Sequence, residues 1–414
     1  MLIHSASQLL TLAGGPQRGR KLGALGLIPD GAILIQGEEI IELGNTQEML
    51  SAYPNEERLD AGNCVVMPGF VDPHTHVIWS GDRAEEFEMR LEGKTYLEIL
   101  AAGGGILSTV RPTRTATINR LMEETRPRLQ SMLQHGTTTA EAKTGYGLET
   151  EAELRMLEAL IELDDEGPLE LAITFLGAHA IAPEYKNDPQ AYTDLICEQM
   201  LPELLQRWPQ ERPLPFVDVF CETGAFDLEQ SRQILNQAKN YGFPLKIHAD
   251  EFDNLGGTAL AVELGAASAD HLVATPAEEI RMLADSDTVA VGLPATPFGL
   301  AEEKYTPASE ILAADGIFAL ATDLNPGTAW CENMQFAIAL GCRYMNLTPA
   351  QAIAAATINA AAAIERTERI GSIEPGKQAD LIVLNVPKYQ HLGYRFGTNL
   401  VKQVFKRGKL VVEN

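Results

Sequence analysis

The strongest signal in the sequence is an apolar run that ends in two histidines, Val65-Val66-Met67-Pro68-Gly69-Phe70-Val71-Asp72-Pro73-His74-Thr75-His76. Its β-branched and aromatic residues predict a buried strand that leads up to His76. Alternate side chains of a strand point to the same side, so we expect His74 and His76 to face one way. Two neutral imidazoles on one face begin a site for Zn or Fe. A complete site needs further ligands from the ends of other strands.

Polar residues that suit such a site follow other apolar runs of the chain. His179, His248, His271 and Asp323 each stand at or just beyond the end of a predicted strand. Taken alone, His271 also fits a hydrogen-bonded core histidine, and Asp323 fits a turn residue. If the strand ends meet, His74, His76, His248 and Asp323 form a ligand set that can leave a position open for water, as catalytic sites do. A metal held there would lower the pKa of that water toward about 7.

The middle of the chain alternates between apolar strands and amphipathic helices, which predicts an α/β fold with a parallel sheet. After the strand that leads to His76, the predicted strands cover 137–143, 171–178, 216–221, 245–248, 268–272, 288–293 and 317–323. Amphipathic stretches at 149–163, 228–241, 277–283 and 348–364 predict helices. These βα units predict a (β/α)8 TIM-like barrel over residues 63–365, with catalytic residues at the C-terminal ends of its strands.

Both ends of the chain are rich in short strands. Residues 32–44 and 405–412 each have the pattern of a hairpin, and residues 371–384 read as a turn followed by a strand. We therefore expect a small β-sandwich domain built from residues 1–62 together with 366–414. The rival fold, a doubly wound nucleotide-binding sheet, has no support, because the sequence contains neither a GxGxxG after a first strand nor a Walker motif.

Composition and charge limit the partners. The chain has 414 residues, of which 45% are hydrophobic, and its five cysteines are scattered without a CxxC. This pattern favours reduced thiols, and the absence of a long apolar run or a leader pattern predicts a cytoplasmic protein with no membrane partner. The net charge of −25 repels phosphate backbones, so we expect no nucleic-acid partner. An anionic substrate would need a local cation in the pocket, and Arg83 is seven residues past His76.

The sequence resembles the amidohydrolase superfamily. The resemblance rests on two stretches: Pro68-Gly69-Phe70-Val71-Asp72-Pro73-His74-Thr75-His76, and the Gly-Ser-Ile turn followed by Gly-Lys-Gln-Ala-Asp-Leu at 371–381. Within that superfamily the chain is most similar to the imidazolonepropionase family over nearly its whole length. Stretches that carry this similarity include 76–87, 102–111, 143–148, 174–180, 248–251, 268–272 and 322–328.

This resemblance implies a reaction, a cofactor and a site. The reaction is hydrolysis of the ring amide of 4-imidazolone-5-propanoate, a small anionic substrate, to N-formimidoyl-L-glutamate by a metal-activated water, a step of histidine degradation. One Zn or Fe ion per subunit would be bound by His74, His76, His248 and Asp323. Asp323, His271 and Glu251 would be catalytic. Substrate would be bound by Arg83, Tyr146, His179, Glu251, Asn325, Gly327 and Thr328. The family also implies a homodimer.

Two alternatives and one further lysine complete the sequence-based picture. Another cyclic amidohydrolase or a nucleobase deaminase could use the same ligand set, and a non-catalytic barrel scaffold is a rival from another class. Some relatives bridge two metals with a carboxylated lysine from the fourth strand. Lys143 lies on the second predicted strand, and the fourth offers no lysine, so we expect a mononuclear site.

Overall fold

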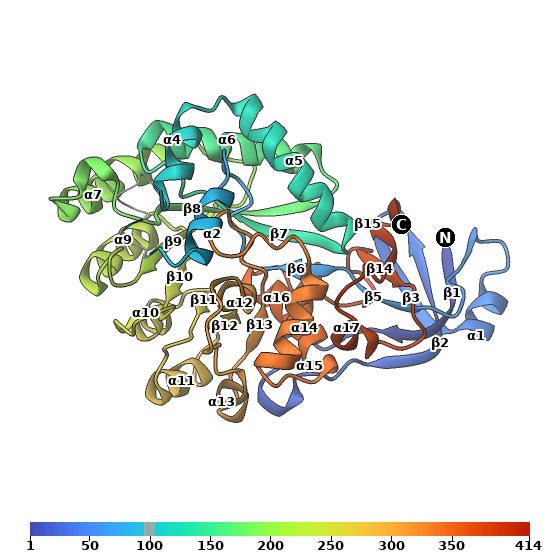
Figure 1. The fold of residues 1–414 in the computed structure, drawn as a ribbon. Coiled ribbons are helices and arrows are strands. Elements are labelled where there is room, and N and C mark those ends of the chain that lie inside the picture. Colours follow the sequence, from blue (N-terminus) through green and yellow to red (C-terminus); the bar gives the residue numbers. More distant parts are fainter. Residues whose placement is uncertain (95–97, 99–103) are drawn as a thin grey trace.

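The computed structural model describes residues 1–94, 98 and 104–414 and contains two large sheets, one parallel and one mixed (Figure 1). The parallel sheet has eight strands, each paired with the next in chain order. They are β6 (Phe70–Asp72), β7 (Thr137–Lys143), β8 (Glu170–Ala178), β9 (Phe216–Cys221), β10 (Lys246–Ala249), β11 (Ser268–His271), β12 (Val289–Gly292) and β13 (Phe318–Leu320). A parallel bridge between Thr75 and Leu324 joins the chain after β6 to the chain after β13. The predicted (β/α)8 barrel is therefore confirmed.

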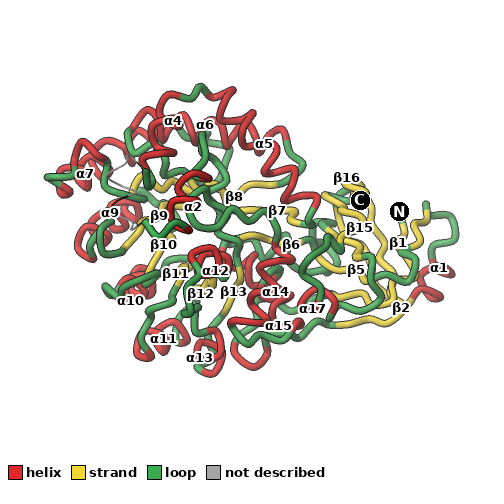
Figure 2. Tube along the Cα trace, in the orientation of Figure 1, coloured by secondary structure: helices red, strands yellow, loops and turns green. Residues whose placement is uncertain are grey.

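Helices surround the barrel strands (Figure 2). Those of the barrel region are α2 (Ala84–Leu91), α4 (Leu107–Thr115), α5 (Ile118–Gln134), α6 (Thr150–Glu166), α7 (Pro189–Leu195), α8 (Leu201–Arg207), α9 (Leu228–Asn240), α10 (Gly257–Leu264), α11 (Ala277–Ala284), α12 (Ala295–Leu300), α13 (Ala308–Ala313), α14 (Met334–Tyr344), α15 (Pro349–Ala355) and α16 (Ile358–Ala363). Local signals set their ends: α9 begins after Asp227, which forms a capping box with Gln230. Within the described ranges, no helix has the length and apolar character needed to cross a membrane.

The second sheet is built from both ends of the chain, and both termini lie beside the barrel (Figure 1). Its strand order is β16-β15-β14-β5-β1-β2-β3, and β4 pairs with β1. The strands are β1 (Leu2–Leu10), β2 (Leu27–Gln36), β3 (Glu39–Asn45), β4 (Arg58–Asp60), β5 (Val65–Pro68), β14 (Leu381–Leu384), β15 (Val401–Lys406) and β16 (Lys409–Glu413), with α1 (Thr46–Ala52) and α17 (His391–Tyr394) nearby in the chain. Both predicted hairpins, β2–β3 and β15–β16, are confirmed. The domain limits, 1–62 with 366–414 and 63–365, remain a proposal.

Two element predictions are wrong in detail. The run from Val65 is not one barrel strand: β5 pairs with β1 and β14 in the mixed sheet, and only β6 joins the barrel. The change of sheet falls at Gly69, where a Cβ would collide with the side chain of Thr138. The stretch 348–364 forms two helices, α15 and α16, because Thr357 turns away from helical geometry and its hydroxyl bonds back to the carbonyl of Ile353.

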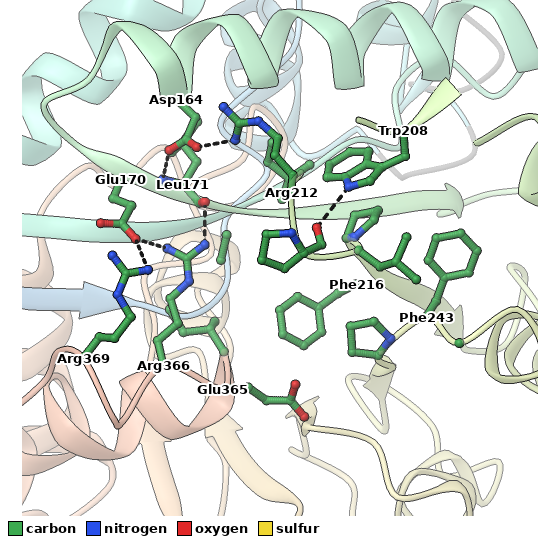
Figure 3. Close-up of a pocket in the computed structure, with 18 of the residues that line it drawn as sticks. Asp164, Glu170, Leu171, Trp208, Arg212, Phe216, Phe243, Glu365, Arg366 and Arg369 are labelled. Carbon is green, nitrogen blue, oxygen red and sulfur yellow. Dashed lines mark hydrogen bonds and ion pairs between the residues drawn. The ribbon is translucent and has the colours of Figure 1, made fainter. Parts of the chain in front are cut away.

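Glu170 joins the barrel to the mixed sheet at the opposite end from the strand ends that carry the histidines. It begins β8 and lies in a cavity of about 900 Å³ at the N-terminal ends of β8 and β9 (Figure 3). Its carboxylate accepts from Arg366 at 2.9 Å, from Lys406 at 3.2 Å and from Arg407 at 3.1 Å. Burial alone would raise the pKa of Glu170, but Lys406 and Arg366 hold that pKa well below its usual value. Because these cations are already paired with Glu170, we assign the group to stability, as is usual for this barrel face.

We expect Glu170→Gln to lower the free energy of unfolding by about 3 kcal/mol at pH 7, because it leaves buried cations without their anion. Since folding lowers the pKa of Glu170, its contribution is fully present above the usual value of 4.5 and is lost as the pH falls further. Urea denaturation at several pH values should therefore show the difference between variant and parent shrinking below pH 4.5. Glu166→Gln, which removes an exposed partner of Arg126, is the control and should change little.

Candidate active site

The four predicted metal ligands lie together at the C-terminal ends of their strands. His74 and His76 follow β6, His248 lies on β10, and Asp323 follows β13. The Nε2 atoms of His74 and His76 are 3.5 and 3.6 Å from Oδ1 of Asp323. His248 Nε2 is 3.3 Å from His76 Nε2. All four side chains are buried, so the barrel brings three imidazoles and one carboxylate into one buried cluster.

Two carboxylates behind the cluster fix the tautomers of two of these histidines. His74 Nδ1 is 2.6 Å from Oδ2 of Asp270, and His248 Nδ1 is 2.9 Å from Oδ2 of Asp218. His74 Nδ1 therefore carries the proton and leaves the lone pair of Nε2 facing the cluster, an arrangement typical of metal-binding histidines. His248 Nδ1 faces Asp218 at ion-pair distance, which favours the same tautomer. The Nε2 atom of His74 is buried and has no hydrogen-bond partner among the described residues. A cation between the Nε2 atoms would satisfy it, so the donor set fits a metal ion.

The protonation states also suit a metal site. Burial, together with nearby positive charge, lowers the pKa of His74 and His76 well below the usual value, which keeps both imidazoles neutral. Burial raises the pKa of Asp323 to about 6. Oδ2 of Asp323 accepts a hydrogen bond from Thr296, which leaves Oδ1 on the side of the histidines. Metal ligands must be deprotonated, and a bound cation would favour the deprotonated form of Asp323.

Asp218 and Asp270 were not predicted as site residues. A sequence signal existed, because both interrupt apolar strands and Asp270 directly precedes His271. Yet a charged residue in a strand more often faces solvent, and only the barrel shows that these two face its interior. The structure thus adds two residues that orient the predicted ligands.

His271 and Glu251 lie beside the cluster, as predicted. The His271 ring lies 5.4 Å from that of His74, and its Nε2 is 3.7 Å from Oε2 of Glu251. Burial and the charge of Asp323 raise the pKa of Glu251 well above its usual value, whereas burial lowers the pKa of His271. His271 and Asp323 have φ angles of 82° and 55°, which side-chain-bearing residues rarely adopt. Such strain is concentrated at functional sites, and here it turns both side chains toward the cluster.

A cavity of about 560 Å³ opens over this cluster. It is lined by every predicted site residue except His74, and His74 lies in the cluster itself. The prediction missed the other lining residues: Glu86, Arg90, Lys94, Gly105, Ile106, Phe220, Phe252, Leu300 and Glu302. Lys94 directly precedes the stretch 95–103, most of which lies outside the described residues, and Gly105 lies two residues after it. The cavity thus combines a candidate metal cluster with cationic side chains.

Arg83 lies at the start of α2 and is the predicted cation of the cavity. Its Nε donates to Oε2 of Glu86 at 2.9 Å, and Glu86 in turn accepts from Ser108 at 2.5 Å. The pair with Glu86 orients the guanidinium. Among the described residues, Arg83 donates side-chain hydrogen bonds only through Nε. Gly327 lies against the Nη1 end of the Arg83 guanidinium. A Cβ at residue 327 would collide with Nη1. Gly327 therefore leaves room for the guanidinium.

Asn325 shapes the loop after β13. Its side-chain nitrogen donates to the carbonyl of Asp323 at 2.7 Å, and its side-chain oxygen accepts from the backbone of Gly327 and Thr328, each at 2.8 Å. The side-chain amide of Asn325 therefore makes its hydrogen bonds within the loop itself. In this structure Asn325 fixes the positions of Asp323, Gly327 and Thr328 rather than offering free donors to the cavity.

Tyr146 and His179 form one wall of the cavity. The His179 ring stacks on that of His76, with centroids 4.7 Å apart, and its Nδ1 donates to the carbonyl of Gly145 at 3.0 Å. Burial lowers the pKa of His179 to about 3, so the ring is neutral. The loop that carries Tyr146 is fixed by the buried carboxylate of Glu153, which accepts from the backbone N–H groups of Gly145, Gly147 and Leu148.

Comparison with known proteins identifies the family. Residues 65–411 match the model of the amidohydrolase family. The imidazolonepropionase of Herpetosiphon aurantiacus is 52% identical, with 100% of this chain and 97% of the relative covered. That of Chloroflexus aggregans is 47% identical, with 100% and 99% covered.

Solved structures agree on the fold. A mutant of atrazine chlorohydrolase from Arthrobacter aurescens, complexed with zinc and atraton, has a TM-score of 0.75 at 17% identity and covers 100% of this chain and 95% of its own. The 5-methylcytosine deaminase of Klebsiella pneumoniae has a TM-score of 0.74 at 16% identity, with 100% and 98% covered. Such identities show the fold alone.

These relatives confirm the predicted resemblance and the predicted hydrolase class. The family match also supports a metal ion, for which the histidine and aspartate cluster offers candidate ligands. The high sequence identity to imidazolonepropionases over the full length of the chain assigns it to one group within the amidohydrolase family. The chain therefore belongs to the amidohydrolase family and, within it, to the imidazolonepropionases.

Proposed function

We propose that this chain hydrolyses the ring amide of 4-imidazolone-5-propanoate to N-formimidoyl-L-glutamate in histidine degradation. The observation that carries the proposal is a single cavity that joins a histidine–aspartate cluster to the oriented guanidinium of Arg83. The cluster suits hydrolysis of an amide, and the guanidinium suits a carboxylate tail. The relatives named imidazolonepropionase support the same reaction.

One Zn or Fe ion would be held by His74, His76, His248 and Asp323. When bound, the metal would supply an activated water and would polarise the carbonyl of the ring amide. Lys143 is no candidate for a bridging carboxylated lysine, because its ammonium lies 2.7 Å from both Glu141 and Asp218. We therefore propose a mononuclear site.

The remaining residues would move the protons. Asp323 would accept the proton of the attacking water, and the hydrogen bond from Thr296 would hold its carboxylate in place. His271 would hydrogen-bond the attacking water or the oxyanion that forms on the former carbonyl oxygen. As the C–N bond breaks, Glu251, whose pKa is raised well above its usual value by burial, would donate a proton to the leaving ring nitrogen.

Substrate position would be set on the other side of the cavity. Arg83 would bind the propanoate, and the neutral rings of Tyr146 and His179 would contact the imidazolone ring. The loop with Asn325, Gly327 and Thr328 would close that side. We also retain the predicted homodimer and cytoplasmic location as proposals.

Turnover of freshly prepared 4-imidazolone-5-propanoate by the purified protein tests the reaction. We expect loss of its ultraviolet absorbance, formation of formimidoylglutamate and no release of ammonia from guanine or cytosine run in parallel. Deamination of a nucleobase without turnover of the imidazolone would instead support the deaminase alternative. No turnover of any of these substrates by protein with bound metal would keep the amidohydrolase chemistry and reopen the choice of substrate. Protein that binds no metal and gains no activity on addition of Zn or Fe would leave the scaffold alternative.

Arg83→Ala should retain the metal and raise KM for 4-imidazolone-5-propanoate by about 10- to 100-fold, the usual worth of a charge-assisted hydrogen bond. Arg83→Lys is the matched variant: it keeps the charge but loses the two-pronged geometry, so its KM should fall between those of parent and alanine variant. Steady-state kinetics with metal content measured on the same samples would check this. An unchanged KM for Arg83→Ala would remove the carboxylate-binding role.

A further inference from the structure

A group of five buried charged side chains lies inside the barrel next to the metal cluster. Its members come from four different strands and are all fully buried: Glu141, Lys143, Asp218, Lys246 and Asp270. Burying charges is costly unless they are paired, so such a group needs a reason to be present. The proposed chemistry uses none of the five directly.

Lys143 connects the carboxylates of this group. Its Nζ lies 2.7 Å from Oδ2 of Asp218, 2.7 Å from Oε1 of Glu141 and 3.8 Å from Oδ2 of Asp270. The same Oδ2 atom of Asp218 faces His248, and the same Oδ2 atom of Asp270 faces His74. One ammonium therefore lies within ion-pair distance of both of the oxygens that face metal-ligand histidines. Lys246 Nζ lies 3.6 Å from the same Oδ2 atom of Asp270.

The main chain of Lys143 supports the same site. Its backbone N–H donates to the carbonyl of Thr75, the residue between His74 and His76. Lys246 binds the residue that precedes His74: its Nζ donates to the carbonyl of Pro73 at 3.0 Å. Burial alone would lower the pKa of Lys143, but the charges of Asp218 and Glu141 raise it, so the side chain stays an ammonium.

We propose that Lys143 is a positioning residue of the metal centre, which holds Asp218 and Asp270 so that they present His248 and His74 to the metal with Nε2 foremost. This inference rests on the proposed metal site and deepens it. Lys143 touches neither the ligand atoms nor the substrate cavity, so it acts through the two aspartates. Residues that orient ligands in this way typically change metal affinity by about 10- to 100-fold.

The test is the Zn²⁺ dissociation constant of Lys143→Met, measured on metal-free protein by competition with a chromophoric chelator. We expect Zn²⁺ to bind about 10- to 100-fold more weakly than to the parent. Lys406→Met is the matched control, because Lys406 is also buried between two carboxylates, Glu170 and Asp380, that hold no histidine. It should lose stability but keep the parent affinity within threefold.

A double-mutant cycle shows whether Lys143 acts through Asp218. Adding Lys143→Met to Asp218→Asn should weaken Zn²⁺ binding by a smaller factor than adding it to the parent. The same factor in both backgrounds would contradict action through this aspartate.

If Lys143→Met does not fold, Glu141→Gln/Lys143→Met removes the buried ion pair together and is judged by the same criterion. Parent-like Zn²⁺ affinity in a folded variant lacking Lys143 would overturn the inference. If the parent itself binds no Zn²⁺ or Fe²⁺, the proposed metal site fails as well, so the two failures are distinguishable.

Discussion

The convergence of three imidazole Nε2 atoms and one carboxylate in a buried space is the constraint on which the rest of the structure depends. Lone pairs that face one another without hydrogen bonds are costly in a protein interior and become favourable when a cation lies between them. The barrel makes this convergence possible, because β6, β10 and β13 end at the same face. Asp218 and Asp270 then orient two of the rings, and Lys143 lies behind both aspartates.

The two faces of the barrel have different tasks. The C-terminal face carries the cluster, the cavity and two residues with strained backbone, His271 and Asp323. The N-terminal face carries Glu170 and its cations, which connect β8 to the mixed sheet of the two chain ends. Because the residues of the cavity and the residues that stabilise the fold lie on opposite faces, the loops around the cavity can vary without loss of the fold.

Much of the site could be predicted because its signals are local. A His-x-His just beyond an apolar strand places two imidazoles close together, and His248 and Asp323 stand at the ends of runs with clear strand patterns. The position of β5 could not be predicted, since its pairing depends on β1 and β14, which are far away in the sequence. The roles of Asp218 and Asp270 were missed for a related reason: the strand pattern does not say which face carries the charge.

A crystal structure of the metal-loaded protein with anomalous data at the metal edge tests the central claim most directly. We expect one metal ion about 2.0–2.2 Å from Nε2 of His74, His76 and His248 and from a carboxylate oxygen of Asp323. Two metal ions, or one ion bound instead by His74, Glu141 and Asp270, would contradict it.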